Sequence, residues 1–417
     1  MPPNPAQPPD GPSLTILGKL FVLLVVVGSL YGAYLLFSRS TGAPAAGANA
    51  ASGGGAAAPA VGGSPPTAGE SVKIGLAYGT EKKRWLEAAV ADFAKTPEGR
   101  GVTIDLIPLG SIEGAQAILR GDEAAKRINV WAPASSLFRQ SFVQDWQDKY
   151  GGDPIAKEEQ LALTPMVFVF WEERYKVFEQ KYRAADFRSI GQALAEPGGW
   201  DAIAGRQTNW GFFKFGHTHP NKSNSGLAAL VLMAYDFADK PRGLALSDVT
   251  DAKFQTWMND LERAASGMIE STGTLMRDMV LKGPSTYDAL LVYESVAIDY
   301  LKNAEGRSGR LRVEYPKYNL WNDNPYYVLN TPWTTPAQTK AAQTFLAYLM
   351  SEPVQLKALA HGFRPGNPAV AIKFPESPFV LYESYGLKTD LPVVCEPPKP
   401  EVISNLLLGW QRSQGNR

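Results

Sequence analysis

The sequence predicts an α/β fold in which a parallel sheet carries helices on both of its faces. Three strand–helix units in succession predict it, with strands at 72–77, 102–107 and 128–131 that are each followed by a helix. This alternation is typical of parallel sheets. The three joins hold small residues and a Ser or Thr at the carboxyl end of a strand, the edge at which open α/β sheets bind ligands.

Composition narrows the class of protein. The 417 residues are 45% hydrophobic and 20% charged, which is enough for two globular lobes. Because 41 basic residues balance 41 acidic ones, nothing indicates a nucleic-acid partner. Cys395 is the single cysteine, so no intrachain disulfide can form, and only three histidines are present. We therefore expect no metal site and no cofactor.

The N-terminal segment predicts a membrane tether. Residues 1–13 are Pro-rich and are expected to be disordered. Residues 14–37 are almost wholly apolar and about long enough to cross a bilayer as one helix. A cleaved signal peptide is the alternative, although its apolar core is usually shorter. Residues 38–70 are rich in Ala, Gly and Pro and predict a flexible linker.

The rest of the chain continues the alternation. Apolar runs predict further strands, and runs with helical spacing predict further helices. The expected strands are 161–171, 210–215, 288–294, 311–315 and 326–329. The expected helices are 227–235, 254–268, 275–281, 295–301, 337–350, 354–360 and 402–411.

One stretch, Thr208–Phe237, combines a strand, a polar turn and a helix that is apolar on every side. A helix of that kind is expected to be buried. Its first turn, Ser223 to Gly226, offers hydroxyl, amide and backbone N–H groups, which suit a polar ligand. The alternative is a helix with an ordinary Ser cap and no ligand.

Four pieces of sequence occur in a familiar order. They are INVWAPASS at 128–136, HPNKSNSGLAAL at 219–230, GPSTYDALLVYES at 283–295 and AAQTFLAYLMSEPVQLKALAHGFRPGN at 341–367. Together they resemble the bacterial extracellular solute-binding proteins of the type II periplasmic binding fold, at superfamily level the molybdate and sulfate receptors. The closer resemblance is to membrane-anchored solute-binding domains that often precede a von Willebrand A domain, and EVISNLLLGWQ at 401–411 resembles the segment before that domain.

The resemblance implies a two-lobe domain over 71–394, with one lobe at about 71–162 and 314–394, the other at about 163–313, and a tail with a short helix at 395–417. It also implies a ligand in the cleft between the lobes. Carried over by position, the ligand contacts are Gly79, Thr80, Gly110, Ser111, Asn224, Ser225, Thr272, Thr274 and Tyr293. The sequence departs from the molybdate pattern at Glu81, which would repel an anion if it faced the cleft.

The expected function is that of a single-pass, membrane-tethered solute-binding protein whose globular part lies outside the cytoplasm. It would close two lobes around a small polar solute, with an oxyanion as one candidate, and deliver it to an ABC-type permease. The alternative is a sensing or partner-binding module of the same fold, with a von Willebrand A-type protein as its partner. No GxSxG, HExxH, P-loop or CxxC pattern occurs, so we expect no enzymatic activity and no catalytic residue.

Overall fold

The computed structural model describes residues 71–265, 268–391 and 393–415. The anchor predicted at 14–37 and the linker predicted at 38–70 lie outside these residues. None of the helices within the described part of the chain is long and apolar enough to cross a membrane.

A mixed sheet organises the first lobe, with described strands in the order β2–β1–β3–β10–β4. β1 (Val72–Tyr78) pairs in parallel with β2 (Val102–Pro108) and β3 (Val130–Ala132), as the sequence predicts. β10 (Pro325–Leu329) runs antiparallel to both β3 and β4 (Ile155–Gln160), so the sheet is not parallel throughout. The local pattern of β10 carries no information on direction, because its partners are distant in sequence.

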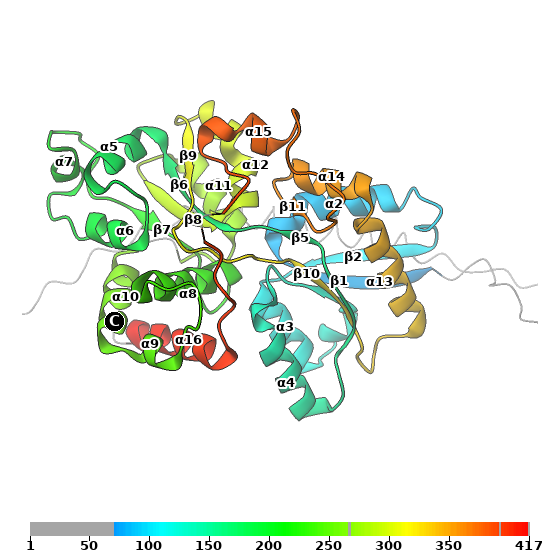
Figure 1. The fold of residues 1–417 in the computed structure, drawn as a ribbon. Coiled ribbons are helices and arrows are strands. Elements are labelled where there is room, and N and C mark those ends of the chain that lie inside the picture. The colour runs from blue at the N-terminus through cyan, green and yellow to red at the C-terminus, as the bar shows by residue number, and fades with distance from the viewer. Residues whose placement is uncertain (1–70, 266–267, 392, 416–417) are drawn as a thin grey trace, which may run out of the picture. The chain divides into compact units, whose positions relative to one another are not determined.

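Helices cover both faces of this sheet (Figure 1). α2 (Lys83–Phe93), α13 (Pro336–Leu349) and α14 (Glu352–Ala360) lie on one face, while α3 (Ser111–Arg120) and α4 (Arg139–Tyr150) lie on the other. Each face has its own cluster of buried apolar side chains. This arrangement confirms the predicted packing of helices on both faces.

The second lobe is built on a sheet with described strands in the order β7–β8–β6–β9. Its central strands, β6 (Met166–Trp171) and β8 (Ala289–Tyr293), are antiparallel and buried along their whole length. β9 (Leu311–Glu314) pairs with β6, and β7 (Phe215–Gly216) pairs in parallel with β8. Strands buried on both faces need a continuous apolar sequence. The sequences of both central strands are continuously apolar.

Helix α8 (Asn224–Ala238) lies at the centre of the second core. All its residues from the first to Asp236 are buried, as expected from a helix that is apolar on every side. α8 and α10 (Ala252–Ala264) lie on one side of the sheet, and α11 (Thr272–Lys282) and α12 (Glu294–Glu305) lie on the other (Figure 1).

The strand predicted at 161–171 is wrong as a single element. It divides into β5 (Ala162–Leu163) and β6, which belong to different sheets. Pro165 stands between them and has no backbone N–H to donate to a ladder. β5 pairs instead with β11 (Arg364–Pro365) in a separate two-stranded sheet.

The strand predicted at 210–215 is also shorter than expected, because only Phe215 and Gly216 are extended in β7. Asn209 and Gly211 have φ angles of 60° and 72°, which turn the chain immediately before it. The polar stretch after β6, for which no element is predicted, forms three helices, α5 (Glu172–Tyr182), α6 (Phe187–Leu194) and α7 (Gly199–Ala204).

The chain passes between the two lobes between residues 163 and 166 and between 314 and 325. It passes again after β11, because Phe379 of α15 (Pro378–Leu381) packs in the core of the second lobe. The last passage differs from the predicted division, which assigns 314–394 to the first lobe.

The C-terminal helix α16 (Pro400–Gly415) is longer than the predicted 402–411. It contacts α8, α10 and α9 (Leu246–Thr250) of the second lobe. The side chains of Val402, Leu406 and Trp410 are buried in the second core. The apolar face of this helix is therefore covered by its own chain.

Candidate ligand-binding cleft

Polar groups of the two lobes meet where β1 and β2 end and where α8 and α11 begin. The hydroxyl oxygen of Thr80, after β1, lies 3.0 Å from that of Ser271, which caps α11. Gly110, after β2, allows an equally close approach, because a Cβ there would lie 2.6 Å from the carbonyl oxygen of Lys222. These contacts define the mouth of a cleft between the lobes.

Two cavities lie on either side of the contact between Thr80 and Ser271, and both residues line both cavities. One, of about 370 Å³, also includes Glu81 and Thr274 in its wall. The other, of about 350 Å³, also includes Gly110. Cavities of this size fit small molecules.

Behind the mouth, four hydroxyl groups form a buried network around Ser225. Its Oγ lies 2.6 Å from the hydroxyl oxygens of Thr218 and Thr272 and 3.1 Å from that of Ser223. Ser223 stands at the N-cap of α8, but its side chain makes no capping hydrogen bond. The hydroxyls therefore connect the starts of α8 and α11 and do more than an ordinary Ser cap.

A second buried group joins α8 to β8 and to the segment between β9 and β10. The Asn224 amide nitrogen donates to the Tyr293 hydroxyl at 3.0 Å and to Asn322 Oδ1 at 2.8 Å. Burial, together with the nearby charge of Glu81, raises the pKa of Tyr293 well above its usual value. The phenol is therefore a neutral hydrogen-bonding group at physiological pH.

Glu81 and Lys82 form an ion pair at 2.5 Å in the first lobe, within the short helix η1 (Thr80–Lys82). Lys82 begins a run of three basic residues, Lys82 to Arg84, for which the sequence favours a solvated helix face over an anion clamp. That expectation is wrong for Lys82, which is fully buried. Its ammonium also donates to Asn324 Oδ1 and to the carbonyl oxygen of Pro133. Burial lowers the pKa of Lys82, and the charge of Glu81 acts in the opposite direction.

Two of the predicted contacts have structural roles within the first lobe. Gly79 leaves room for Glu81, because a Cβ at Gly79 would overlap the Glu81 carboxylate. The buried Ser111 hydroxyl accepts a hydrogen bond from the Ala134 backbone N–H at 3.0 Å, which ties the start of α3 to the segment after β3.

The nine predicted contacts fall into two groups. Thr80, Gly110 and Thr274 line the two cavities. The others lie behind the cavity walls, and five of them are fully or almost fully buried: Ser111, Asn224, Ser225, Thr272 and Tyr293. The sequence did not single out Asn322 and Asn324, and the only local signal for the two asparagines is the polar turn NDN at 322–324.

Next to the hydroxyl network, a buried pair extends the polar contacts within the second lobe towards its C-terminal helix. His217 Nε2 lies 2.8 Å from Glu262 Oε1, and Trp410 Nε1 donates to Glu262 Oε2 at 2.6 Å. Burial lowers the pKa of His217, but the charge and hydrogen bond of Glu262 outweigh it, so the net pKa is raised. The buried pair of His217 and Glu262 thereby links Trp410 of α16 to the segment around His217. The next residue in that segment, Thr218, contacts Ser225 in the hydroxyl network.

Nothing in the described ranges gathers three or more His, Cys, Asp or Glu side chains into a group that could hold a metal ion. The two neighbouring histidines of the sequence, His217 and His219, have separate partners. His217 bonds to Glu262, while the ring of His219 packs edge-on against Trp410 with centroids 4.8 Å apart.

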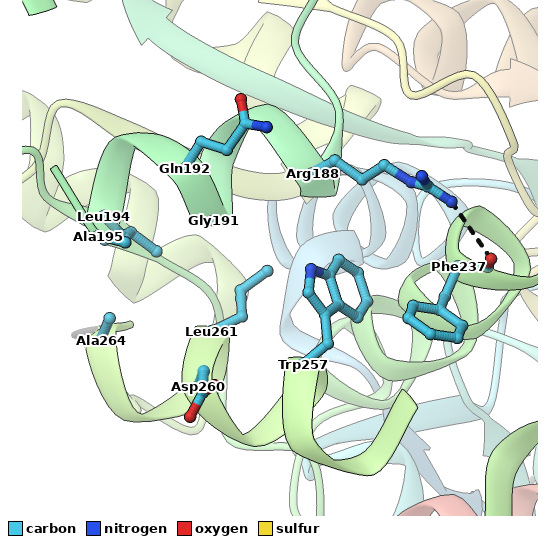
Figure 2. A pocket seen from close by; sticks show the side chains of 10 residues that line it. All are labelled: Arg188, Gly191, Gln192, Leu194, Ala195, Phe237, Trp257, Asp260, Leu261 and Ala264. Carbon is cyan, nitrogen blue, oxygen red and sulfur yellow. Dashed lines mark hydrogen bonds between the residues drawn. The ribbon is translucent and has the colours of Figure 1, made fainter. Parts of the chain in front are cut away.

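A larger cavity, of about 690 Å³, lies elsewhere on the second lobe, between α6, the end of α8 and α10. Figure 2 shows Trp257 and Leu261 facing it, with Arg188 reaching across to the carbonyl oxygen of Phe237 at 3.3 Å. None of the predicted ligand contacts lines it. Its wall is mainly apolar.

Comparisons with known proteins agree with this architecture. A family model described as bacterial extracellular solute-binding protein matches residues 74–364. No curated protein matches the chain.

Several solved structures share the fold at low sequence identity. The sulfate-binding protein SubI from Mycobacterium tuberculosis has a TM-score of 0.54 at 15% identity, over 83% of this chain and 99% of that one. A periplasmic thiamin-binding protein has a TM-score of 0.55 at 11% identity, over 84% and 99%. The maltose-bound MalE3 of T. maritima has a TM-score of 0.54 at 14% identity, over 82% and 93%.

Proposed function

Because this chain belongs to the bacterial extracellular solute-binding proteins, we propose that it binds a small polar solute in the cleft between its two lobes. The observation that carries the proposal is the contact between Thr80 and Ser271, with a cavity on either side of it. One residue comes from each lobe, so a solute in either cavity would touch both lobes. Lobe closure around a ligand is the usual response in such proteins.

The solute would then pass to a membrane permease of the ABC type. The apolar run at 14–37 and the uncharged linker at 38–70 support a receptor tethered by one membrane helix, with its lobes outside the cytoplasm. The structural neighbours carry names that refer to sulfate, thiamin and maltose. Such variety within one fold means that the solute must be inferred from this chain's own cleft.

A sensing module that binds a von Willebrand A-type protein is the second candidate. The resemblance of 401–411 to the segment before such a domain favours it. However, Leu406 and Trp410 are buried in the second core, so the apolar face of α16 is not available to a partner. The transport role is therefore the better supported of the two.

A thermal-shift experiment on the full-length protein tests the proposal. Sodium sulfate, thiamin and maltose would be titrated, and a ligand at a hundredfold excess over Kd should stabilise the fold by about 2.7 kcal/mol. Replacing Thr274 by Trp places a large ring in the cavity wall and should remove that stabilisation while the ligand-free protein melts normally.

Thr256→Trp is the matched control, because Thr256 is exposed on α10, away from the cleft. It should bind as the wild type does. If the bound solute stabilises Thr274→Trp as strongly as it stabilises Thr256→Trp, the cleft is not the binding site.

A further inference from the structure

The carboxylate of Glu81 lies inside the cleft. Glu81 lines the cavity of about 370 Å³, yet only 6% of its side chain is exposed. It is close enough to the second lobe for its charge to act on Tyr293, the partner of Asn224. The carboxylate end of a buried ion pair therefore already stands where the two lobes meet.

Lys82 does not offer its positive charge to a solute. Its ammonium has three protons to donate, and three acceptors take them: Glu81, Asn324 and the carbonyl of Pro133. The side chain is 0% exposed. The buried ion pair is thus neutral as a unit and saturated on its cationic side.

Behind the cavity wall lies an acceptor that lacks a donor. Asn322 donates its amide to the Thr164 carbonyl, so its Oδ1 must accept from the Asn224 amide nitrogen. This fixes the orientation of Asn224 and leaves its Oδ1 without a hydrogen-bond partner among the described residues, although Asn224 is only 2% exposed. A buried acceptor in that state favours a ligand that brings a donor.

The positively charged side chains at the cleft mouth do not make the cavity favourable for an anion. Arg84, Lys83 and Arg277 line the same cavity, but each stands within 4 Å of a carboxylate: Lys83 and Arg277 of one in their own lobe, and Arg84 of Asp299 in the second lobe. More than half of each of these side chains is exposed. Exposed, paired and screened charges of this kind contribute little.

We propose that Glu81 is the specificity-determining residue of the cleft and that it excludes oxyanions. The head group that fits beside Glu81 carries N–H or O–H donors and no negative charge. This inference rests on the proposed function, since it names the kind of solute that the cleft accepts. It also gives Gly79 a role, because a Cβ at Gly79 would overlap the Glu81 carboxylate where it now lies.

The test compares the full-length wild type with Glu81→Gln and with Glu87→Gln. Glu87 is the matched control because it lies on the next helix, α2, with half of its side chain exposed. Sodium sulfate is the anionic probe, titrated against sodium chloride at equal ionic strength. Ethanolamine and maltose are the probes with ammonium and hydroxyl donors, and the readout is the apparent Kd from thermal shifts.

We expect sulfate to bind Glu81→Gln at least tenfold more tightly than it binds the wild type or Glu87→Gln. Loss of the carboxylate leaves the buried Lys82 ammonium without its counter-charge, and a sulfate ion would supply one. A double variant, Glu81→Gln with Lys82→Met, removes both charges and should lose that gain. The wild type should bind ethanolamine or maltose in preference to sulfate.

Two results would overturn the assignment. One is sulfate binding to the wild type as tight as that to Glu81→Gln. If Glu81→Gln does not fold, a wild type that binds sulfate more tightly than both ethanolamine and maltose overturns the assignment instead. The other is a wild type that binds neither ethanolamine nor maltose, together with an affinity for sulfate that Glu81→Gln does not increase. If Glu81→Gln binds sulfate more tightly than the wild type does, but no probe stabilises the wild type, the role of Glu81 stands and the proposed receptor function fails.

Discussion

Asp236, near the end of α8, shows what burial does to a single carboxyl group. Its Oδ2 is buried without a hydrogen-bond partner in the described chain. Burial, aided by the charge of Asp186 and opposed by that of Arg188, raises the pKa of Asp236 to about 6. Because the folded pKa lies above the unfolded one, the stabilising contribution is complete below pH 4 and is lost as the pH rises through about 6.

Asp236→Asn should therefore stabilise the protein at pH 8 and change little at pH 4. A shift of about two pKa units corresponds to about 3 kcal/mol, and the desolvated amide reduces the expected gain to about 2 kcal/mol. Urea unfolding at the two pH values measures it. Asp260→Asn is the control, since 65% of that side chain is exposed, and an equal gain from both variants would contradict the assignment.

Lys82 illustrates the limit of prediction at the residue scale. It stands in a run of three basic residues, Lys82 to Arg84, and the sequence pattern treats them alike. In the structure the second and third are exposed while Lys82 is buried. The difference comes from acceptors 51 and 242 residues away in the chain, at Pro133 and Asn324, so no local pattern encodes it.

Among the elements, α16 depends most on distant contacts. Its residue Trp410 packs in the second core and donates to Glu262, which also pairs with His217. A helix of this length with one apolar face is marginal alone, and packing supplies most of its stability. Sequence periodicity predicts that the helix exists, while only the fold shows that its apolar face is covered.

Trp410→Ala should destabilise the protein by about 4 kcal/mol, the usual cost of removing a buried Trp side chain. It also removes a donor to Glu262. Leu408→Ala on the same helix is the control and should cost under about 0.5 kcal/mol, because Leu408 is 45% exposed. Urea unfolding at pH 7 compares the two, and similar losses would mean that α16 is not packed as described.

Helix α8 lies at the other extreme, since its burial is readable from sequence. Its residues are apolar on all sides, and such a helix has no solvent face to offer. The length of the strand expected before it, at 210–215, could not be predicted in the same way. Asn209 and Gly211 take left-handed backbone angles that end the extended run early, and an apolar stretch alone does not reveal such turns.

At the scale of the molecule, the two lobes are held unequally at their two contact regions. Next to the passages between the lobes, Arg364 of β11 makes a buried bidentate pair with Glu294 of α12, at 2.8 and 2.9 Å. At the cleft mouth, the lobes meet through the hydroxyls of Thr80 and Ser271 and through a half-exposed ion pair, with Arg84 3.7 Å from Asp299. A neutral hydrogen bond contributes about 1 kcal/mol and an exposed ion pair about 0–1 kcal/mol, so the mouth should open at little cost.

A disulfide across the mouth tests this picture. Cysteines replacing Thr80 and Ser271 would have their sulfur atoms near the positions of two oxygens that lie 3.0 Å apart. The native Cys395 is buried and should not interfere. Oxidation should trap the closed cleft and stop solute exchange in the full-length protein, and reduction should restore it.

Exchange is measured by the dissociation rate of the stabilising solute from the thermal-shift panel. Thr80→Cys alone is the control, because it adds one thiol with no partner at the mouth. Unchanged exchange in the oxidised double variant, after loss of both added thiols is verified by titration, would show that the cleft does not open there.

The sequence by itself determined the alternating α/β architecture, the buried helix α8, the family resemblance and the chain regions that meet at the cleft. These follow from local periodicity and from short motifs, which act within a few residues. Only the tertiary structure decided that β10 pairs antiparallel with its neighbours and that residues 161–171 form two strands of different sheets. It also decided that the apolar face of α16 packs on the second lobe and that the Glu81–Lys82 pair is buried. Strand direction and the cost of burying charge depend on partners far along the chain, and only the folded molecule brings those partners together.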